Sequence, residues 1–397
     1  MKDKSKKKRT VRTILISFFS LLLIGVICII AFLEITYKVD NTLISKNENY
    51  NVVLVQSDYT TLAKADDDGN YLDDDFKIIS FTDFHLDVNR KAGNVTIEML
   101  IRNIVSEKPD LVVFVGDNIT SVFNTRRTKQ LAQIMEELGV YWTCVVGNHE
   151  GDNILSISKQ KMVDIFASYP HCLIENDIKT TSGGETVSGV GNHVINLLDA
   201  DADIRQSLYF LDCGEEMSGQ DRIKYADEII DTKINKYDYI KESQIEWYKE
   251  TVLAIDTLAG KTVRSVIFDH VPLTEFGTAY DDLDAQILFG TRLETVCCSG
   301  HNSGLFDAMI ELGSTQAVIS GHDHVNDYAV IYKGVILAYN QASGYSSYNV
   351  ITEDLSNKLI QGFSVYTIDK DGGFLMDSYK NADLYPNEQA EVLKLYD

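Results

Sequence analysis

The order of short apolar runs and amphipathic segments restricts the fold of this chain more than any other feature. Five runs rich in Val, Ile and Phe have the length of buried strands, and they span 77–82, 111–115, 141–146, 265–268 and 317–320. Helical spacing of apolar residues occurs at 95–107, 125–138, 156–168, 242–258 and 303–312. Strands that alternate with helices in this way predict a layered α/β domain. A later β-rich group, 328–332, 335–339 and 363–369, predicts a second sheet.

The composition permits a large hydrophobic core and excludes several classes of protein. Hydrophobic residues make up 45% of the 397 residues and charged residues 24%, so the chain is neither disordered nor collagen-like. The chain contains 36 Lys and Arg residues and 59 Asp and Glu residues. The resulting formal charge of −23 argues against a protein that binds nucleic acid by neutralising its phosphates. A small ligand is therefore the expected partner.

The six cysteines predict neither a disulfide framework nor a CxxC metal site, so the hydrophobic core must stabilise the fold. They are Cys28, Cys144, Cys172, Cys213, Cys297 and Cys298.

The amino-terminal segment has the features of a membrane anchor. Residues 1–12 carry seven cations and one anion, a net charge of +6 against a total of −23, so the rest of the chain carries −29. Residues 14–33 contain no charge, which is enough length for a helix to cross a bilayer. We expect a transmembrane signal anchor at 13–35, with residues 1–12 in the cytoplasm and the remainder outside the cell membrane. A cleaved signal peptide and a lipid-modified Cys28 are the alternatives.

Residues 36–75 are polar and acidic and predict a stalk before a folded domain at 76–397. Two acidic triplets, 66–68 and 73–75, flank Gly69 and Asn70 and predict a solvated turn. A calcium loop is disfavoured because the alternating ligand spacing and the closing Glu are missing. A short strand at 51–55 could add to the edge of the domain.

Polar side chains follow the five predicted strands directly. They are Asp83 and His85, then Asp117 and Asn118, then Asn148, His149 and Glu150, then Asp269 and His270, and finally His322, Asp323 and His324. Open α/β sheets gather their ligand sites at the carboxyl ends of strands. Singly, each residue fits a turn, a cap or the core, but five of the eight histidines fall here. By position alone, His171, His193 and His301 are interpreted as structural.

These residue types predict a dinuclear metal site. Asp, Asn and His supply oxygen and nitrogen donors that suit zinc, manganese or iron. Seven candidate ligands exceed the need of one ion, but they fit two if one carboxylate bridges both. The positive charge of two divalent ions would exceed the combined negative charge of Asp83, Asp117 and a bridging hydroxide. The site would then attract a phosphate group, which the hydroxide attacks in line.

The motifs resemble those of the calcineurin-like metallophosphoesterases, which are D-x-H, G-D, G-N-H-E/D, a single H and G-H-x-H. Here they stand as 83–85, 116–117, 147–150, His270 and 321–324, and they span 242 residues from Asp83 to His324. The resemblance implies one catalytic unit with a four-layer α/β/β/α sandwich of two mixed sheets, preceded by one transmembrane helix.

Further stretches are similar to a purple-acid-phosphatase-like branch of that family, namely 109–119, 208–214, 269–276, 302–313 and 320–327. This resemblance implies a first metal held by Asp83, His85, Asp117 and His324. It implies a second metal held by Asp117, Asn148, His270 and His322. His149 would orient the substrate and protonate the leaving oxygen.

One position departs from the purple acid phosphatases proper. Their tyrosinate ligand lies three residues after the second-motif Asp, and this chain has Thr120 there. The metals are therefore expected to be two divalent or trivalent ions of manganese, iron or zinc, without a firmly held ferric ion. Residues expected to contact the substrate are Asn118, His301, Asn302 and Tyr345.

The expected function is metal-dependent hydrolysis of a small phosphorylated substrate, with phosphomonoesters favoured, on the outer face of the membrane. Two alternatives stay open. One is a phosphodiesterase with the same site, and the other is a catalytically inert, membrane-anchored module that keeps the metals for stability.

Overall fold

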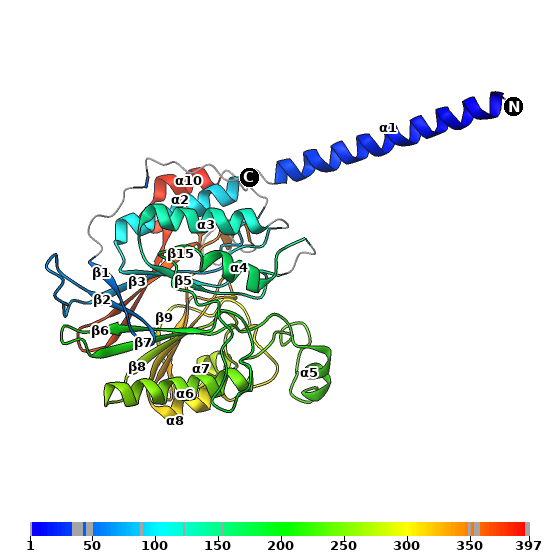
Figure 1. Ribbon diagram of the computed structural model, residues 1–397. Coiled ribbons are helices and arrows are strands. Elements are labelled where there is room, and N and C mark those ends of the chain that lie inside the picture. The colour runs from blue at the N-terminus through cyan, green and yellow to red at the C-terminus, as the bar shows by residue number, and fades with distance from the viewer. Residues whose placement is uncertain are drawn as a thin grey trace. The chain divides into compact units, whose positions relative to one another are not determined.

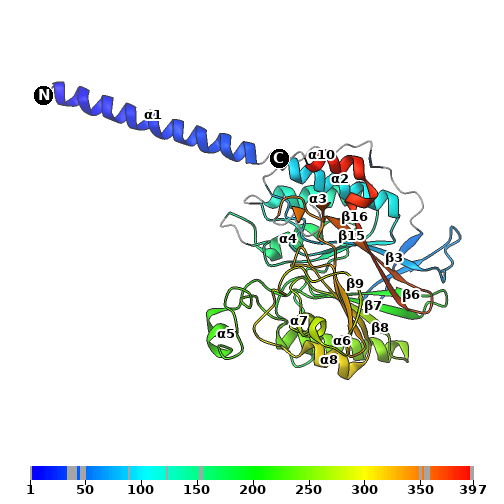
Figure 2. The ribbon, with the colours of Figure 1, turned by 180° about the vertical axis from the view of Figure 1, so that it is seen from behind.

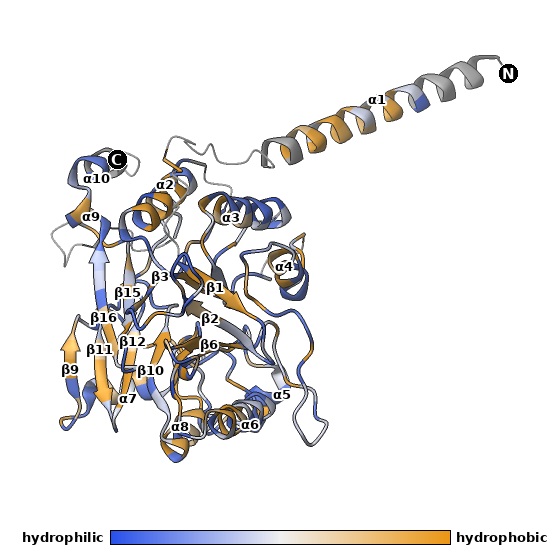
Figure 3. Cartoon of the chain, turned by 60° about the vertical axis from the view of Figure 1, so that its left-hand side comes forward, coloured by the Kyte–Doolittle hydropathy of each residue, from blue (hydrophilic) through white to orange (hydrophobic). Residues whose placement is uncertain are grey.

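The computed structural model describes residues 2–33, 43–44, 51–87, 90–121, 124–151, 155–347, 351–352 and 358–393. The chain divides into two compact units, Met1–Tyr37 and Lys38–Asp397. The described part of the first unit is one helix, α1 (Lys2–Leu33). Its stretch Arg12–Ile29 is long and apolar enough to cross a membrane, and Figure 3 colours most of this stretch as hydrophobic. Its side chains are exposed. This helix is a signal peptide or an anchor by length and composition.

The second unit is built on two mixed sheets (Figures 1 and 2). The larger sheet has the order β1-β2-β6-β7-β8-β10-β12-β11-β9, and the smaller has the order β16-β15-β3-β4-β5. The strands of the larger sheet are β1 (Val52–Val55), β2 (Thr60–Lys64), β6 (His193–Leu198), β7 (Ile204–Phe210), β8 (Arg264–Phe268), β9 (Gln286–Phe289), β10 (Thr315–Ser320), β11 (Ala329–Tyr332) and β12 (Val335–Tyr339). Those of the smaller sheet are β3 (Phe76–Phe81), β4 (Leu111–Val115), β5 (Trp142–Val145), β15 (Gly362–Ile368) and β16 (Phe374–Lys380). A separate pair is β13 (Ile351–Thr352) and β14 (Lys358–Leu359).

Helices cover the outer face of each sheet, which gives the expected four layers (Figure 1). Over the smaller sheet lie α2 (Arg90–Glu107), α3 (Asn124–Leu138), α4 (Lys159–Phe166) and α10 (Pro386–Leu393). Over the larger sheet lie α6 (Glu242–Ala259), α7 (Glu275–Asp281) and α8 (Leu305–Leu312). The remaining helices are α5 (Gly219–Lys224) and α9 (Asn381–Leu384).

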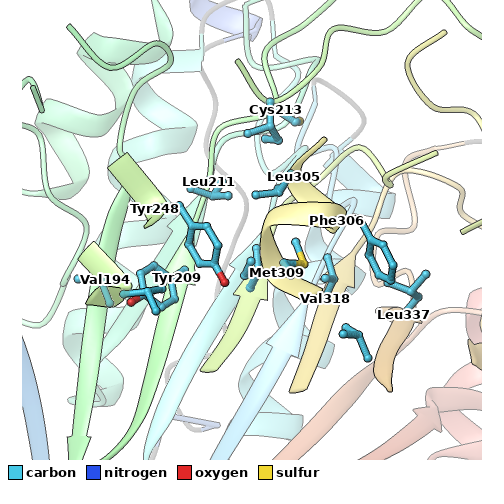
Figure 4. Packing of buried hydrophobic residues seen from close by; sticks show 14 of the residues in the cluster. Val194, Tyr209, Leu211, Cys213, Tyr248, Leu305, Phe306, Met309, Val318 and Leu337 are labelled. Carbon is cyan, nitrogen blue, oxygen red and sulfur yellow. The ribbon is translucent and has the colours of Figure 1, made fainter. Parts of the chain in front are cut away.

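Two hydrophobic clusters join these layers. The one between the sheets contains Ile78 and Val113 from the smaller sheet and Phe210 and Phe268 from the larger. The other lies between the larger sheet and its helices, where Tyr248 and Met309 pack on Val318 (Figure 4). Because strands of both sheets are buried on two faces, their sequences are continuous apolar runs rather than alternating ones.

The late β-rich group does not form a sheet of its own, contrary to expectation. β12 pairs in parallel with β10 and joins the larger sheet, together with β11. β15 pairs antiparallel with β3 and joins the smaller sheet. The apolar pattern marks a strand but carries no information on its partner, and β15 pairs with a strand that lies almost 290 residues earlier.

The folded body also begins earlier than the expected boundary at residue 76. β2 pairs in parallel with β6, and β1 pairs antiparallel with β2, so residues 52–64 form the edge of the larger sheet. The acidic turn has the expected form, since Asp66 Oδ1 accepts hydrogen bonds from the backbone N–H groups of Asp68 and Asn70. Thus the expected stalk includes two strands, while residues 34–42 and 45–50 lie outside the described part.

Candidate metal centre

The strand ends bring the predicted polar residues together from both sheets. β3, β4 and β5 run parallel to one another in the smaller sheet, and β8 and β10 run parallel in the larger. Each of these strands ends one to four residues before its polar motif. Because the two sheets pack face to face, side chains that follow the carboxyl ends of both sets meet at one edge of the sandwich.

The first group of side chains is Asp83, His85 and His324. Asp83 Oδ1 lies 3.2 Å from His324 Nε2 and 3.7 Å from His85 Nε2. The two histidine Nε2 atoms are 3.2 Å apart. The donor atoms of the three residues all lie within 4.8 Å of one another, which is the spacing that one metal ion needs.

The second group, Asp117, His270 and His322, has the same spacing. Asp117 Oδ2 lies 3.1 Å from His270 Nε2. It also lies 3.6 Å from His85 Nε2 of the first group, and Asp83 Oδ1 lies 3.8 Å from His270 Nε2. The groups therefore adjoin, and Asp117 occupies the position between them that a bridging ligand requires.

Asn148 adds a donor on the side of Asp117. Its Oδ1 is buried and accepts no hydrogen bond. Its neighbours both approach the Asp117 carboxylate, because the backbone N–H of His149 donates to Asp117 Oδ1 at 2.9 Å and Gly147 packs against the same oxygen. An orphaned amide oxygen beside a carboxylate fits a metal ligand, since a buried polar atom otherwise needs a hydrogen bond.

The negative charge of the buried carboxylates at the centre favours the binding of cations. Burial acts to raise the pKa of Asp83, but His324 and His270 overcome it and hold that pKa well below its ordinary value. Burial lowers the pKa of His270, yet Asp117 and Asp83 raise it to about 10. Burial and the neighbouring His270 lower the pKa of His322 to about 3. Two buried carboxylates thus require positive charge beside them, which metal ions supply.

Contacts around the centre fix the orientation of its ligands. His270 Nδ1 donates to the backbone carbonyl of Val115 at 2.7 Å, which leaves Nε2 facing Asp117. Asp83 Oδ2 accepts from the backbone N–H of His322 at 3.0 Å and from the Thr82 hydroxyl at 2.9 Å, which leaves Oδ1 facing the histidines. Such outer contacts set the tautomer and direction of metal ligands.

Backbone strain is concentrated at the same place. Seven described non-glycine residues have a positive φ, and four of them are Asp83 (55°), His85 (44°), Asp117 (50°) and His322 (75°). Each left-handed residue of this kind costs on the order of 1–3 kcal/mol and persists where the surroundings enforce it. Four in one centre indicate a functional constraint.

Two glycines of the motifs leave no room for a side chain, because candidate ligands lie close to their backbone. A Cβ at Gly147 would lie 2.2 Å from Asp117 Oδ1, and one at Gly116 would lie 2.5 Å from Cγ of His270. Gly116 also has a φ of +87°. A side chain at either position would push a candidate ligand away.

His149 lies at the rim rather than within either group. Its ring centroid is 5.6 Å from that of His85, and the residue is half-buried. It therefore borders the centre without joining the two groups. Asn118, in contrast, is held by structural contacts, because its Nδ2 donates to Val145 O and to Glu150 Oε1.

The other residues expected to contact the substrate have partners within the protein. Tyr345 is buried in a separate cluster, where its hydroxyl donates to Gln389 Oε1 and accepts from Asn381 Nδ2. These contacts hold the Tyr345 side chain, and its neighbour Gly344 packs against the Asp83 carbonyl. His301 stacks on Tyr225 and contacts Glu228.

Asn302 is held by a side-chain hydrogen bond from its Nδ2 to Glu275 Oε1, and it lines a small cavity with His301. Two further residues had no predicted role at the site. Glu150 is buried and accepts from the backbone N–H of Asn118 at 2.6 Å, and Tyr237 packs on His322. The last residue of the G-N-H-E motif could have signalled Glu150, but no motif marks Tyr237.

The two-sheet sandwich and the paired Asp and His groups define a metallophosphoesterase. The family model described as "Calcineurin-like phosphoesterase" matches residues 76–326, and the chain belongs to this family. That match contains both groups of candidate ligands and confirms the resemblance expected from the motifs.

Curated relatives are similar over most of the chain. The "Probable inactive purple acid phosphatase 28" of Arabidopsis thaliana is 28% identical over 76% of this chain and 77% of its own length. The "Probable inactive purple acid phosphatase 29" of the same plant is 27% identical over 72% of this chain and 78% of its own length. "Phosphatase DCR2" of Saccharomyces cerevisiae is 28% identical over 64% of this chain and 45% of its own length.

The fold is similar to a solved structure, that of a "dimetal phosphatase from Danio rerio". The match has a TM-score of 0.50 and 15% sequence identity, and it covers 77% of this chain and 96% of the other. At this identity the likeness shows the fold alone.

Proposed function

We propose that this chain hydrolyses phosphate esters at a dinuclear metal centre, with phosphomonoesters favoured, on the outer face of the membrane to which α1 anchors it. The observation that carries the proposal is the pair of adjoining groups, Asp83 with His85 and His324, and Asp117 with His270 and His322. Asn148 completes the second group. Two ions would here polarise a phosphate and lower the pKa of a bound water.

The residues of the chain supply the remaining functions. Asp117 would bridge the two ions, since its carboxylate lies between the groups. His149 lies at the rim, where its ring could hydrogen-bond the leaving oxygen. With two divalent ions and two carboxylates the centre is positive, although the body of the chain is strongly acidic. This local charge favours a dianionic phosphomonoester over a monoanionic diester.

The membrane part of the proposal depends on the amino-terminal segment. α1 contains an apolar stretch long enough to span a bilayer, and seven cations lie among its first twelve residues. The positive-inside rule would keep these cations in the cytoplasm and place the metal centre outside. Protection of the carboxyl terminus from protease in intact cells would contradict this orientation.

A second candidate function is supported by the names of relatives. Two plant relatives are named probable inactive phosphatases, so a metal-stabilised module without hydrolytic activity is a specific alternative. The yeast relative is named a phosphatase. A chain that binds two metals and hydrolyses no ester would favour the inactive module.

The decisive experiment measures metal content and hydrolysis together. The full chain in detergent micelles is loaded with manganese, iron or zinc and assayed with p-nitrophenyl phosphate and bis-p-nitrophenyl phosphate. Asp117→Ala is expected to lose both metal and activity, whereas His149→Ala keeps the metal and loses most activity. His171→Ala and Asp281→Ala are matched controls, because these side chains pair with Glu136 and Arg292 away from the centre. Wild-type rates in Asp117→Ala or His149→Ala would refute the assignment.

A further inference from the structure

Residues 214–240, between β7 and α6, form a lobe that reaches the metal centre from the side of the larger sheet. We call this segment the α5 lobe, and Figure 1 shows its helix extending from the body. The two segments at its base are joined, because the backbone N–H of Met217 donates to Lys236 O at 3.0 Å. β-bridges connect Tyr237 to Glu216 and to Ser299. The backbone of Tyr237 is thus held on both sides.

The side chain of Tyr237 contacts a candidate metal ligand. Its ring centroid is 4.2 Å from that of His322, and the two rings meet edge to face at 82°. The residue is half-buried. Aromatic pairs in this arrangement are stable and fix the direction of both rings.

Tyr237 lies beside the centre, because its ring packs on the candidate ligand His322. A tyrosine phenol keeps its proton and is neutral at neutral pH. A neutral hydroxyl near a positive metal pair is a hydrogen-bond donor that suits a phosphate oxygen.

The contacts of His301 also hold the α5 lobe in position. His301 stacks on Tyr225 of the lobe with centroids 3.6 Å apart, and it meets Tyr239 edge to face at 4.8 Å. Its Nδ1 lies 2.7 Å from Glu228 Oε2. His301, which the sequence suggested as a substrate contact, thus anchors the lobe that carries Tyr237.

We propose that Tyr237 contacts the substrate, and that its hydroxyl donates a hydrogen bond to an oxygen of the phosphate group bound at the metal centre. This inference rests on the proposed function and assigns substrate recognition to the α5 lobe. Edge-to-face packing on His322 places the ring beside the second group of ligands, and the paired backbone at Glu216 and Ser299 keeps it there.

The test compares Tyr237→Phe with the wild type, using the full chain in detergent micelles loaded with manganese. The variant keeps the ring on His322 and loses only the hydroxyl. The dissociation constant for inorganic phosphate is expected to rise about ten- to a hundredfold, the range for a hydrogen bond to a charged group. The kcat/KM for p-nitrophenyl phosphate should fall by a similar factor, while the content of two metals per chain stays unchanged.

Tyr332→Phe is the matched control, because Tyr332 is a half-buried tyrosine on β11 that packs on Phe306. It should bind phosphate as the wild type does. Tyr237→Ala removes the ring as well and should lower metal affinity in addition to phosphate affinity.

The outcomes test the role of Tyr237 separately from the proposed hydrolase function. Unchanged phosphate binding in Tyr237→Phe overturns the proposal, as does loss of metal in that variant, because either result leaves Tyr237 with a purely structural role. If the metal-loaded wild type hydrolyses no ester but Tyr237→Phe still binds phosphate more weakly, the hydrolase assignment fails and the Tyr237 contact stands.

Discussion

The two sheets of the sandwich contribute different chemistry to one centre. The smaller sheet supplies both carboxylates, Asp83 and Asp117, whereas the larger sheet supplies His270, His322 and His324. Neither sheet holds a complete group alone, since Asp83 and His85 need His324, and Asp117 needs His270 and His322. Metal binding should therefore link the sheets as well as support catalysis.

The largest expected effect comes from removing one ligand of the first group, from either the smaller or the larger sheet. Asp83→Ala removes a ligand of the smaller sheet, and His324→Ala removes one of the larger. Each should lower kcat/KM for p-nitrophenyl phosphate by about a thousandfold, because a lost metal removes several kcal/mol of transition-state stabilisation. The double variant should be no worse than either single one, since residues that hold one ion act as a unit. Effects that multiply in the double variant would contradict a shared ion.

Removing the metal tests the linking role directly. Adding a chelator to the manganese-loaded chain should lower the melting temperature of the body by on the order of 5 °C, since a ligand at about a thousand times its Kd contributes about 4 kcal/mol. Differential scanning calorimetry measures this shift. Asp83→Ala should show a smaller shift than the wild type, and equal shifts would mean that the metal binds outside the two groups.

A smaller effect is expected from displacing one ligand without removing it. Gly147→Ala places a methyl group 2.2 Å from Asp117 Oδ1, so the carboxylate must move. Metal affinity, measured by competition with a chelating dye, should fall about ten- to a hundredfold, as for other residues that orient ligands. Gly219→Ala is the control, because nothing lies within 4 Å of its added Cβ. Equal affinities in the two variants would rule out this steric account.

The smallest effect concerns a link between the sheets away from the metals. His193 on β6 is fully buried, and its Nε2 lies 2.7 Å from the Thr143 hydroxyl on β5. Burial lowers the pKa of His193 to about 4. The unfolded chain therefore binds a proton below about pH 6.5 that the folded chain excludes down to about pH 4, so stability falls as pH falls through this window.

The matching measurement is urea unfolding of wild type and His193→Gln at pH 7 and pH 5. In the wild type this histidine should remove about 2 kcal/mol of stability between the two values, which His193→Gln would not lose. The same acid sensitivity in both proteins would assign the loss to other groups.

Much of the centre was predictable because its residues follow strands that the sequence marks clearly. The apolar run at 111–115 is β4 at the same bounds, and Asp117 follows it at the expected edge. The metal-binding pattern of Asp, Asn and His needed no knowledge of strand pairing, since each of these residues follows the carboxyl end of a predicted strand.

The features that the sequence did not reveal depend on long-range contacts. β15 joins the sheet of β3, and β2 pairs with β6 in the larger sheet, because pairing is decided by packing rather than by local pattern. Tyr237 and Tyr345 are both tyrosines in irregular segments. Only the fold shows that the first lies on His322 while the second packs in another cluster.

The distribution of the ligands along the chain also has a consequence for biosynthesis. Both groups require residues beyond β8, namely His270, His322 and His324. A polypeptide that ends before His322 contains neither complete group. Neither metal could therefore be held by its full group before His322 and His324 are translated, and a product terminated before them would lack a ligand of each group.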